Sequence, residues 1–444
     1  MPATLVDKVK KAGVVGAGGA GFPTWKKIDA RVDYVIANGA ECEPLLHNDQ
    51  HLMAREAARV VKGIELVMKA TGAKKGIVGL KEKYRDAVAS FRRALGKKDH
   101  IRLAFLENAY PAGDEFVIVY ETTGRVIPGG GLPLDVGVVN SNVETFKNIA
   151  DAEEGDPVTS RYITVAGAVR NPVTLEAPIG TTWAELIDAA GGPAVEDFAL
   201  MLGGPMMGKL SYDTSQPVTK TTGAVVVLPR GHALVRRRTV PFSRSLHVTR
   251  QFCCQCTLCT MICPRYLLGH ELYPHLVMRS VLFGLPFPEG NGETTAHLCC
   301  ECELCGLYIC PMNLPIARIN GNIKRNLKAL GWEAGKKSPT PTPRFLRETT
   351  RIATNRLVAR LGLAPYQVKV PFSDRALSPS RVTIPLAQNV GAAAVPCVRV
   401  GQRVKKGQVI AEIPEGKLGA RHHASIGGVV KEITDSIVIA AAQQ

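Results

Sequence analysis

Eight of the chain's twelve cysteines stand in two short runs whose spacing is typical of iron–sulfur ligands. The runs are Cys253-x2-Cys256-x2-Cys259-x3-Cys263-Pro264 and Cys299-x2-Cys302-x2-Cys305-x4-Cys310-Pro311. A 4Fe-4S cluster takes three thiolates from a tight C-x2-C-x2-C stretch, and in two-cluster proteins the cysteine before proline serves the other cluster. The chemistry that these residues predict is the transfer of single electrons.

This crossing rule predicts two ligand sets. One cluster takes Cys253, Cys256, Cys259 and Cys310, and the other takes Cys299, Cys302, Cys305 and Cys263. The neighbouring Cys254 and Cys300 are expected to be spectators, because using either as a first ligand would lengthen the gap to the third. Structural zinc and disulfides remain weaker interpretations, since zinc usually uses two separated C-x2-C pairs and disulfides need an oxidising compartment.

Composition indicates a globular protein of two to four domains, because 444 residues exceed a single core and 45% are hydrophobic. No apolar run approaches the roughly 18 residues that span a bilayer, so no transmembrane segment is expected. The first residues lack the apolar core and cleavage site of a signal peptide. We therefore expect a cytoplasmic protein, which also suits thiolates that must bind iron.

The net charge of +16 would normally suggest nucleic acid or an anionic membrane as a partner. Basic residues gather beside both cysteine runs. They are Arg230, Arg236, Arg237, Arg238, Arg244 and Arg250 before the first run and Lys324, Arg325 and Lys328 after the second. They can offset negative thiolate clusters or steer an acidic redox partner, and a solvated basic face is the plain alternative.

The first half of the chain divides into two units. Residues 1–155 alternate strands near 34–37 and 76–80 with a helix near 51–71, which predicts an α/β domain. Residues 156–230 carry the strands RYITVAGAV and GAVVVLP, with a helix that Thr181 or Thr182 opens and Gly191-Gly192 closes. This pattern predicts a small α+β domain.

The second half begins with the cysteine runs at 231–335, where we expect a helix directly after each Cys-Pro pair because proline fits a first helical turn. Residues 336–344 form a proline-rich linker. The stretch 344–362 spaces Leu346, Ile352, Leu357 and Leu361 as one amphipathic helix, which either packs within the molecule, the use we favour, or docks a partner. The linker and this helix together make up the segment 336–372. The short alternating strands of residues 373–444 predict an all-β module.

The glycine-rich string GAGGAG matches G-x-G-x-x-G at Gly16, Gly18 and Gly21, and Glu41 lies at a suitable distance for a ribose contact. That motif must follow a strand and open a helix. Here a helix-like stretch precedes the loop and Phe22-Pro23 follows it, so we reject a Rossmann fold. The glycines, Gly19 included, still let backbone N–H groups approach a phosphate, with a structural turn as the alternative.

Four motifs in order resemble the flavin-binding signatures of the flavoprotein subunit of respiratory complex I. They are GAGGAGFPTWKK, NGAECEP at 38–44, YPAGDE at 110–115 and VVNSNVET at 138–145. The resemblance implies FMN as a cofactor, with its phosphate near the glycine loop, and NADH as the electron donor. The further flavin contacts that it implies are Lys27, Asn38, Glu41, Glu115, Asn142 and Thr145.

The same resemblance implies that Phe22 stacks on the dinucleotide and that Glu43 lies near the nicotinamide as the catalytic candidate. Two positions depart from the family pattern. Ala40 stands where the family usually has Asp, and Asp114 stands where it has the first Glu of a Gly-Glu-Glu string. These departures bear on the NADH contacts more than on the flavin contacts.

The remaining domains also resemble known modules. Residues 156–230 resemble an SLBB (soluble ligand-binding β-grasp) domain, and the tail resembles a barrel-sandwich hybrid without the Met-Lys-Met turn of a carrier domain. The expected fold is therefore multidomain, α/β and α+β. It comprises a complex-I-flavoprotein-like α/β domain, an SLBB β-grasp domain, a ferredoxin-like two-cluster helical segment and a C-terminal barrel-sandwich hybrid.

This domain order resembles the cobalamin reductases of propanediol-utilisation microcompartments. The resemblance implies electron transfer from NADH through FMN and two 4Fe-4S clusters to cobalamin, in the cytoplasm and within a bacterial microcompartment. The implied partners are cobalamin or a corrinoid-processing enzyme and a microcompartment shell protein. The flavin motifs argue against nucleic acid. The alternative is a subunit like RnfC of membrane Rnf complexes, which passes electrons between NADH and a ferredoxin or another non-corrinoid acceptor.

Overall fold

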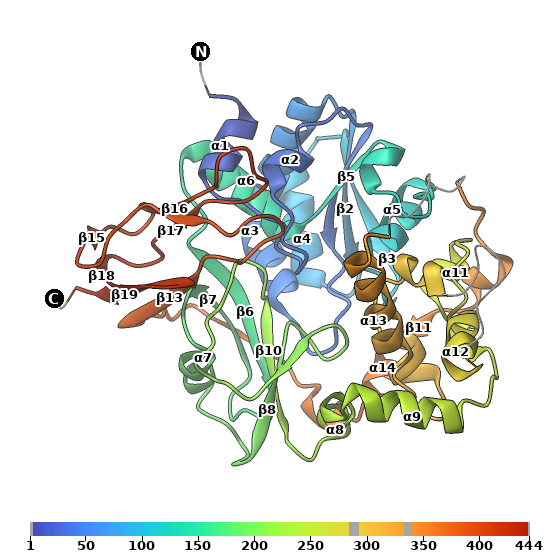
Figure 1. The fold of residues 1–444 in the computed structure, drawn as a ribbon. Coiled ribbons are helices and arrows are strands. Elements are labelled where there is room, and N and C mark those ends of the chain that lie inside the picture. The colour runs from blue at the N-terminus through green and yellow to red at the C-terminus, as the bar shows by residue number, and fades with distance from the viewer. Residues whose placement is uncertain (1–2, 284–292, 333–339, 443–444) are drawn as a thin grey trace.

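A computed structural model describes residues 3–283, 293–332 and 340–442 of the chain. Figure 1 shows the C-terminal strands on the left of the view and the helices within residues 264–283 on the right. No helix in this described part combines the length and apolarity that crossing a bilayer requires. Of the expected linker, residues 336–339 lie outside the described ranges, and residues 340–344 contain no helix or strand.

The N-terminal domain is built on a four-stranded parallel sheet in the order β3-β2-β1-β5. Its strands are β1 (Tyr34–Gly39), β2 (Lys75–Lys81), β3 (Ile101–Leu106) and β5 (Val138–Asn142). Its helices are α1 (Leu5–Lys11), α2 (Thr24–Lys27), α3 (Asn48–Thr71), α4 (Arg85–Leu95), α5 (Glu115–Thr123) and α6 (Val143–Glu154). A short strand, β4 (Ala109–Tyr110), and a 3-10 turn, η1 (Pro133–Val136), lie between them.

Side chains of β1 alternate between two cores, as the period of a strand requires. Val35 and Ala37 pack with residues of α3 and α6, whereas Ile36 packs with residues of α5 on the other face. Both faces of the sheet are therefore covered, as is usual for parallel strands. The glycine loop lies between α1 and α2 and follows a helix, which confirms the rejection of a Rossmann motif.

The SLBB domain contains a six-stranded sheet in the order β12-β7-β6-β10-β8-β9. Its strands are β6 (Ser160–Gly167), β7 (Val173–Pro178), β8 (Phe198–Leu202), β9 (Lys209–Ser211), β10 (Ala224–Pro229) and β12 (Phe372–Ser373). Thr182 caps α7 (Trp183–Ala189) through a capping box with Glu185, as the sequence predicts. Trp183 is buried in the core between this helix and the sheet.

The cysteine region is mostly helical. Its elements are α8 (Ala233–Thr239), α9 (Phe242–Phe252), α10 (Leu258–Met261), α11 (Pro264–Leu267), α12 (Pro274–Phe283), η2 (Glu293–Leu298), η3 (Leu304–Ile309) and α13 (Ile316–Ala329). A helix directly follows Cys263-Pro264, as expected, but none directly follows Cys310-Pro311. Asn313 has a left-handed φ of 53°, which interrupts a helix, so α13 begins only after Pro315.

The prediction of one amphipathic helix over 344–362 is wrong. The segment contains a 3-10 turn, η4 (Phe345–Glu348), a short strand, β11 (Ile352–Ala353), and α14 (Thr354–Arg360). The break has a tertiary cause, because β11 pairs with β4 of the N-terminal domain. Leu357 and Leu361 are buried in the core as expected, but Leu346 is exposed and the Arg347 side chain is buried in its place.

The C-terminal residues form two small sheets, in the orders β13-β19-β18-β15 and β14-β16-β17. Their strands are β13 (Arg381–Pro385), β14 (Val395–Pro396), β15 (Arg403–Val404), β16 (Val409–Glu412), β17 (His422–His423), β18 (Gly428–Ile433) and β19 (Ser436–Ala441). A single 3-10 turn, η5 (Ala364–Tyr366), precedes β12. The all-β prediction for the tail is confirmed, and Val390 N–H donates to Gly21 O, which joins this module to the glycine loop.

Candidate electron-transfer site

Three cysteines of the first run and the last cysteine of the second run line one cavity. These are Cys253, Cys256, Cys259 and Cys310, named here the first cage, and the neighbouring Cys254 lines the same cavity. Cys259 and Cys310 are buried, Cys253 is half-buried and Cys256 is exposed. The structure thus brings Cys310 to the first run, and its role as an iron ligand stays a prediction.

The remaining four cysteines of the two runs form a second group, and all four are buried. These are Cys263, Cys299, Cys302 and Cys305, named here the second cage. Cys263 and Cys299 pack with Leu272, and the Cys305 thiol is close enough to both to feel their charge. Cys302 interacts first with the neighbouring Cys300 and more weakly with Cys305. The second cage therefore also combines cysteines of both runs.

Both runs adopt the same backbone conformation around their central cysteine. The residue before it has a left-handed φ, 53° at Gln255 and 55° at Glu301. The residue after it does too, 63° at Thr257 and 65° at Glu303. Such values are uncommon for residues other than glycine, so their repetition marks a chain wrapped tightly around a common centre.

The runs differ after their third cysteine, where the spacing differs by one residue. In the first run the connection is the α-helical turn α10, and in the second it is η3, a π-helical turn. A π-helix closes one residue later than an α-helix, so it absorbs the extra residue of the x4 gap before Cys310. The longer gap therefore still delivers Cys310 to the first cage.

The surroundings of the thiols fit iron–sulfur clusters. Burial raises the pKa of Cys259 and of Cys263 to about 12, so these thiols need a cationic centre to ionise. Backbone N–H groups donate to sulfur, from Glu301 to Cys299 Sγ at 3.3 Å and from Leu314 to Cys310 Sγ at 3.4 Å. Hydrogen bonds of this kind tune cluster potentials.

The glycine loop lies against the start of α6. Ala17 N–H donates to Thr145 Oγ1 at 3.0 Å, and a Cβ added at Gly18 would lie 3.4 Å from Asn142 Cβ. The tip of the turn is exposed, and a Cβ added at Gly19, where φ is +108°, would meet nothing within 4 Å. An open turn that is fixed from behind can present N–H groups to a phosphate, so the loop fits FMN.

Lys27, Asn38 and Glu115 converge near the carboxyl ends of the parallel strands. Lys27 Nζ donates to Asn140 O at 2.9 Å, and Asn38 Nδ2 donates to Gly113 O at 2.9 Å. Burial lowers the pKa of Lys27, and the nearby Glu115 carboxylate opposes this shift. A partly desolvated ammonium at this edge of a parallel sheet fits an anionic ligand.

Glu41 is connected to Asn142 through Asp49. The Glu41 carboxylate accepts the Asp49 N–H at 2.7 Å, and Asn142 Nδ2 donates to Asp49 Oδ2 at 2.8 Å. Desolvation, and then the Asp49 charge, raises the pKa of Glu41 to about 8. Desolvation, and then the Glu144 charge, raises the pKa of Asp49 to about 7. Both carboxyl groups therefore keep a proton to higher pH than exposed carboxyl groups do.

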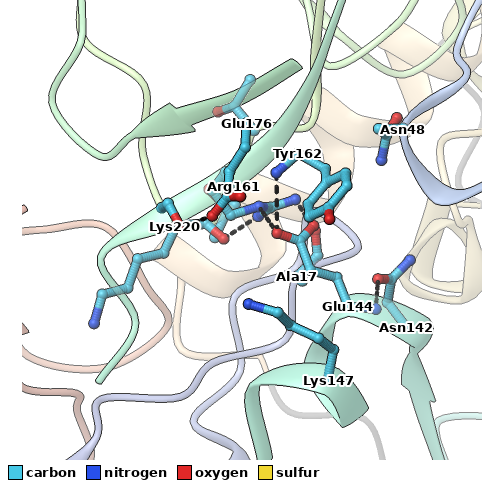
Figure 2. Close-up of polar contacts among 12 residues, drawn as sticks. Ala17, Asn48, Asn142, Glu144, Lys147, Arg161, Tyr162, Glu176 and Lys220 are labelled. Carbon is cyan, nitrogen blue, oxygen red and sulfur yellow. Dashed lines mark hydrogen bonds and ion pairs between the residues drawn. The ribbon is translucent and has the colours of Figure 1, made fainter. Parts of the chain in front are cut away.

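Arg161 of β6 reaches behind the glycine loop from the SLBB domain, as Figure 2 shows. Its Nε lies 3.0 Å from Glu144 Oε1, and its Nη2 donates to Ala17 O at 3.0 Å. It also donates to Lys220 O. The Arg161 and Glu144 side chains are 1% and 2% exposed, so removing either partner would leave a buried unpaired charge. The SLBB domain thereby fixes the position of the loop.

The Glu43 carboxylate is bound by the SLBB domain, and Phe22 forms a backbone hydrogen bond within the glycine loop. Glu43 accepts the N–H groups of Met206 at 2.9 Å and Met207 at 2.8 Å, both in the SLBB domain. Desolvation raises its pKa to about 7. Phe22 is half-buried, and its carbonyl accepts the Gly16 N–H across the loop at 2.9 Å. Their contacts with a dinucleotide stay predictions.

The YPAGDE loop, residues 110–115, also contacts the second cage. Tyr110 Oη donates to Cys302 O at 2.9 Å in a buried position. The Asp114 carboxylate pairs with Arg265, which follows Cys263 by two residues, at 2.5 and 3.0 Å. The motif assigned to the flavin and the second cage therefore share a buried junction.

Several of the basic residues near the cysteine runs have specific structural partners. Arg237 Nη2 donates to Gly306 O at 2.6 Å, and Arg238 donates to Gly208 O at 2.8 Å. Lys324 Nζ donates to Cys299 O at 3.1 Å. These three residues hold the cysteine region together and against the SLBB domain, so only part of the expected basic rim is available to a partner.

Sequence reasoning did not single out Asp49, Glu144, Arg161, Lys220 or Arg265. Glu144 stands inside the VVNSNVET motif, so the motif could have indicated it. Lys220 is buried and donates from Nζ to Gly13 O at 2.7 Å and to Arg421 O at 2.6 Å, which joins three domains. Arg161 lies 144 positions from Ala17 along the chain, and no local pattern connects residues so far apart.

Four known families match successive parts of the chain. They are the Nuo51 FMN-binding domain over residues 9–151, the SLBB domain over 162–210, the 4Fe-4S dicluster domain over 252–315 and the RnfC barrel sandwich hybrid domain over 365–444. These matches confirm the expected fold class. They also confirm FMN and 4Fe-4S clusters as the cofactors, while the domain limits drawn from the sequence stay predictions.

Curated relatives match over nearly the whole length. Cobalamin reductase PduS of Citrobacter freundii is 43% identical over 98% of this chain and 96% of the relative, and that of Salmonella typhimurium is 44% identical over 97% and 95%. A component of the Na⁺-translocating ferredoxin:NAD⁺ oxidoreductase complex of Acetobacterium woodii is 38% identical over 59% of this chain and 58% of the relative. The chain therefore belongs to the PduS cobalamin reductase family.

Proposed function

We propose that this protein passes electrons from NADH to a corrinoid through FMN and two 4Fe-4S clusters. The observation that carries the proposal is the buried contact of the YPAGDE loop with the second cage. It occurs in a chain whose near-full-length relatives are named cobalamin reductases. A corrinoid or a corrinoid-processing enzyme is the proposed acceptor.

Each cage is proposed to hold one cluster through its four thiolates. The first cage supplies Cys253, Cys256, Cys259 and Cys310, and the second supplies Cys263, Cys299, Cys302 and Cys305. Because Cys256 is exposed, the first cage is the one that an external acceptor can approach. Exposed apolar side chains, Phe252, Met261 and Met312, lie on the same segments as its cysteines.

The N-terminal domain is proposed to hold FMN through the glycine loop and the polar residues around it. They are Gly16, Gly18, Gly19, Gly21, Lys27, Asn38, Glu41, Glu115, Asn142 and Thr145. When bound, FMN supplies the change from hydride to single-electron chemistry. Lys27 offers charge to an anionic group, Arg161 keeps the loop in place, and Phe22 and Glu43 are the proposed contacts of NADH.

A location within a bacterial microcompartment, with a shell protein as a neighbour, is part of the same proposal. Its support is the family resemblance. Co-purification of the full chain with intact shells from the native host would test it, and recovery only in the shell-free fraction would contradict it.

Anaerobic titration of the reconstituted protein tests the function. We expect flavin absorption, about eight irons per chain and bleaching on addition of NADH. Addition of cob(III)alamin or cob(II)alamin should then restore the oxidised spectrum. Absence of bound flavin would contradict the proposed NADH-dependent activity. Reoxidation by a ferredoxin but not by a corrinoid would favour the alternative Rnf-like function, which the similarity to the Acetobacterium woodii protein supports.

A further inference from the structure

The junction between the YPAGDE loop and the second cage contains a buried ion pair to which the proposed function gives no role beyond contact. Asp114 and Arg265 form two parallel hydrogen bonds, and their side chains are 11% and 7% exposed. The Arg265 guanidinium also lies over the Phe116 ring, 3.7 Å from its centroid. Bidentate geometry and ring stacking fix this arginine in one position.

Arg265 is joined to the second cage by the chain itself. It lies in the first turn of α11, for which Cys263 is the N-cap residue. The Leu267 N–H donates to Cys263 O at 2.9 Å, so the turn that carries Arg265 is closed on a cysteine of the second cage. A fixed positive charge two residues from a cysteine of the cage stabilises added negative charge in that cage.

Asp114 is joined to the flavin side in the same way. It caps α5 by accepting the Phe116 N–H at 3.0 Å, and it precedes Glu115, whose charge acts on Lys27. Asp114 is also the position that departs from the family pattern. Its shorter side chain both caps the helix and meets the arginine of the next domain.

We propose that the Asp114–Arg265 pair positions the second cage against the flavin domain and sets the reduction potential of its cluster, making that cluster the one that accepts electrons from the flavin. In this order the reduced flavin would give up its electrons one at a time and release its protons to solvent, and the cluster held by Cys263, Cys299, Cys302 and Cys305 would accept the electrons. Electrons then pass to the first cage, which opens to the surface. The inference rests on the proposed flavin and cluster cofactors.

The two members of the pair carry opposite charges, so their removal has opposite expected effects. Arg265→Met leaves the Asp114 carboxylate unpaired beside the cage and should lower the midpoint potential of the second cluster. Asp114→Asn leaves the guanidinium unpaired and should raise it. A residue that only supported the fold would shift the potential in one direction or lose the cluster in both variants.

The test is an EPR-monitored redox titration of the full chain, with each variant also placed in a Cys310→Ser background to isolate the second cluster. Arg347→Met is the matched control, because Arg347 is equally buried at 7% but pairs with Glu121 and Glu348. We expect opposite shifts in the two test variants, an unchanged potential in the control and an unchanged first cluster. If Arg265→Met does not retain the cluster, Asp114→Asn decides alone.

Equal or absent shifts with both clusters present would overturn the inference, as would a shift confined to the first cluster. These outcomes are distinct from a failure of the proposed function. That failure would appear as missing flavin or as clusters that dithionite reduces and NADH does not, in the unmodified protein. Arg265→Lys keeps the charge but not the bidentate geometry, and it should retain most of the native potential.

Discussion

The first cage opens to the surface at Cys256, whereas all four cysteines of the second cage are buried. Their backbones are alike, with left-handed residues at matching positions. The two cages differ in their neighbours. The first cage lines a cavity that Met312 also lines, whereas the second cage contacts the N-terminal domain through Tyr110. The comparison teaches that two copies of one motif can acquire different places in a relay through what packs against them.

The largest effects are expected from replacing Cys263 and Cys310, the two cysteines that each run contributes to the other run's cage. Cys310→Ser should remove the first cluster and Cys263→Ser the second, so that each variant keeps about four of about eight irons. Iron analysis with EPR of the remaining cluster provides the measurement. Cys254→Ser is the matched control and should keep both clusters. Loss of the second cluster in Cys310→Ser would show that each run binds its own iron.

Unequal exposure sharpens the comparison further. The first cluster should be destroyed several-fold faster than the second by an oxidant with a chelator, because Cys256 is exposed and the second cage is buried. Absorbance followed in Cys263→Ser and in Cys310→Ser compares the two clusters singly. Equal rates would show that the surface opening gives no access.

The flavin should be separable from both cages. Arg161→Met removes a buried partner of the glycine loop and leaves Glu144 unpaired, which costs about 1–3 kcal/mol and should weaken FMN binding roughly tenfold to a hundredfold. Flavin fluorescence measures the affinity. Iron content should not change, and Arg161→Met with Glu144→Gln controls for the unpaired charge. Loss of iron together with flavin would mean that Arg161 supports the whole fold.

Much of this arrangement could be predicted from local patterns. The cysteine spacing, the helix cap at Thr182 and the short apolar run of β1 are properties of neighbouring residues, and the structure has them. The helix predicted over 344–362 failed because β11 is held by a distant strand, β4. Arg161 and Arg265 were missed for the same reason, since their partners belong to other domains.

The stability of the flavin-free protein should also depend on pH. The pKa of Glu41 is raised from an ordinary value near 4.5 to about 8, so the folded state holds its proton longer than the unfolded state. Stability should therefore be greatest below pH 4.5 for this group and should fall as the pH rises to about 8. Thermal midpoints over this range measure it, and Glu41→Gln should flatten the slope. An unchanged slope in that variant would assign the effect to other groups.

Two variants directly test whether electrons from the flavin reach the second cluster before the first. NADH is added anaerobically to Cys310→Ser, which should keep only the second cluster, and to Cys263→Ser, which should keep only the first. Rapid freezing and EPR then show which cluster is reduced. We expect fast reduction of the second cluster in Cys310→Ser and little or slow reduction of the first in Cys263→Ser. Fast reduction of the first cluster without the second would contradict this expectation.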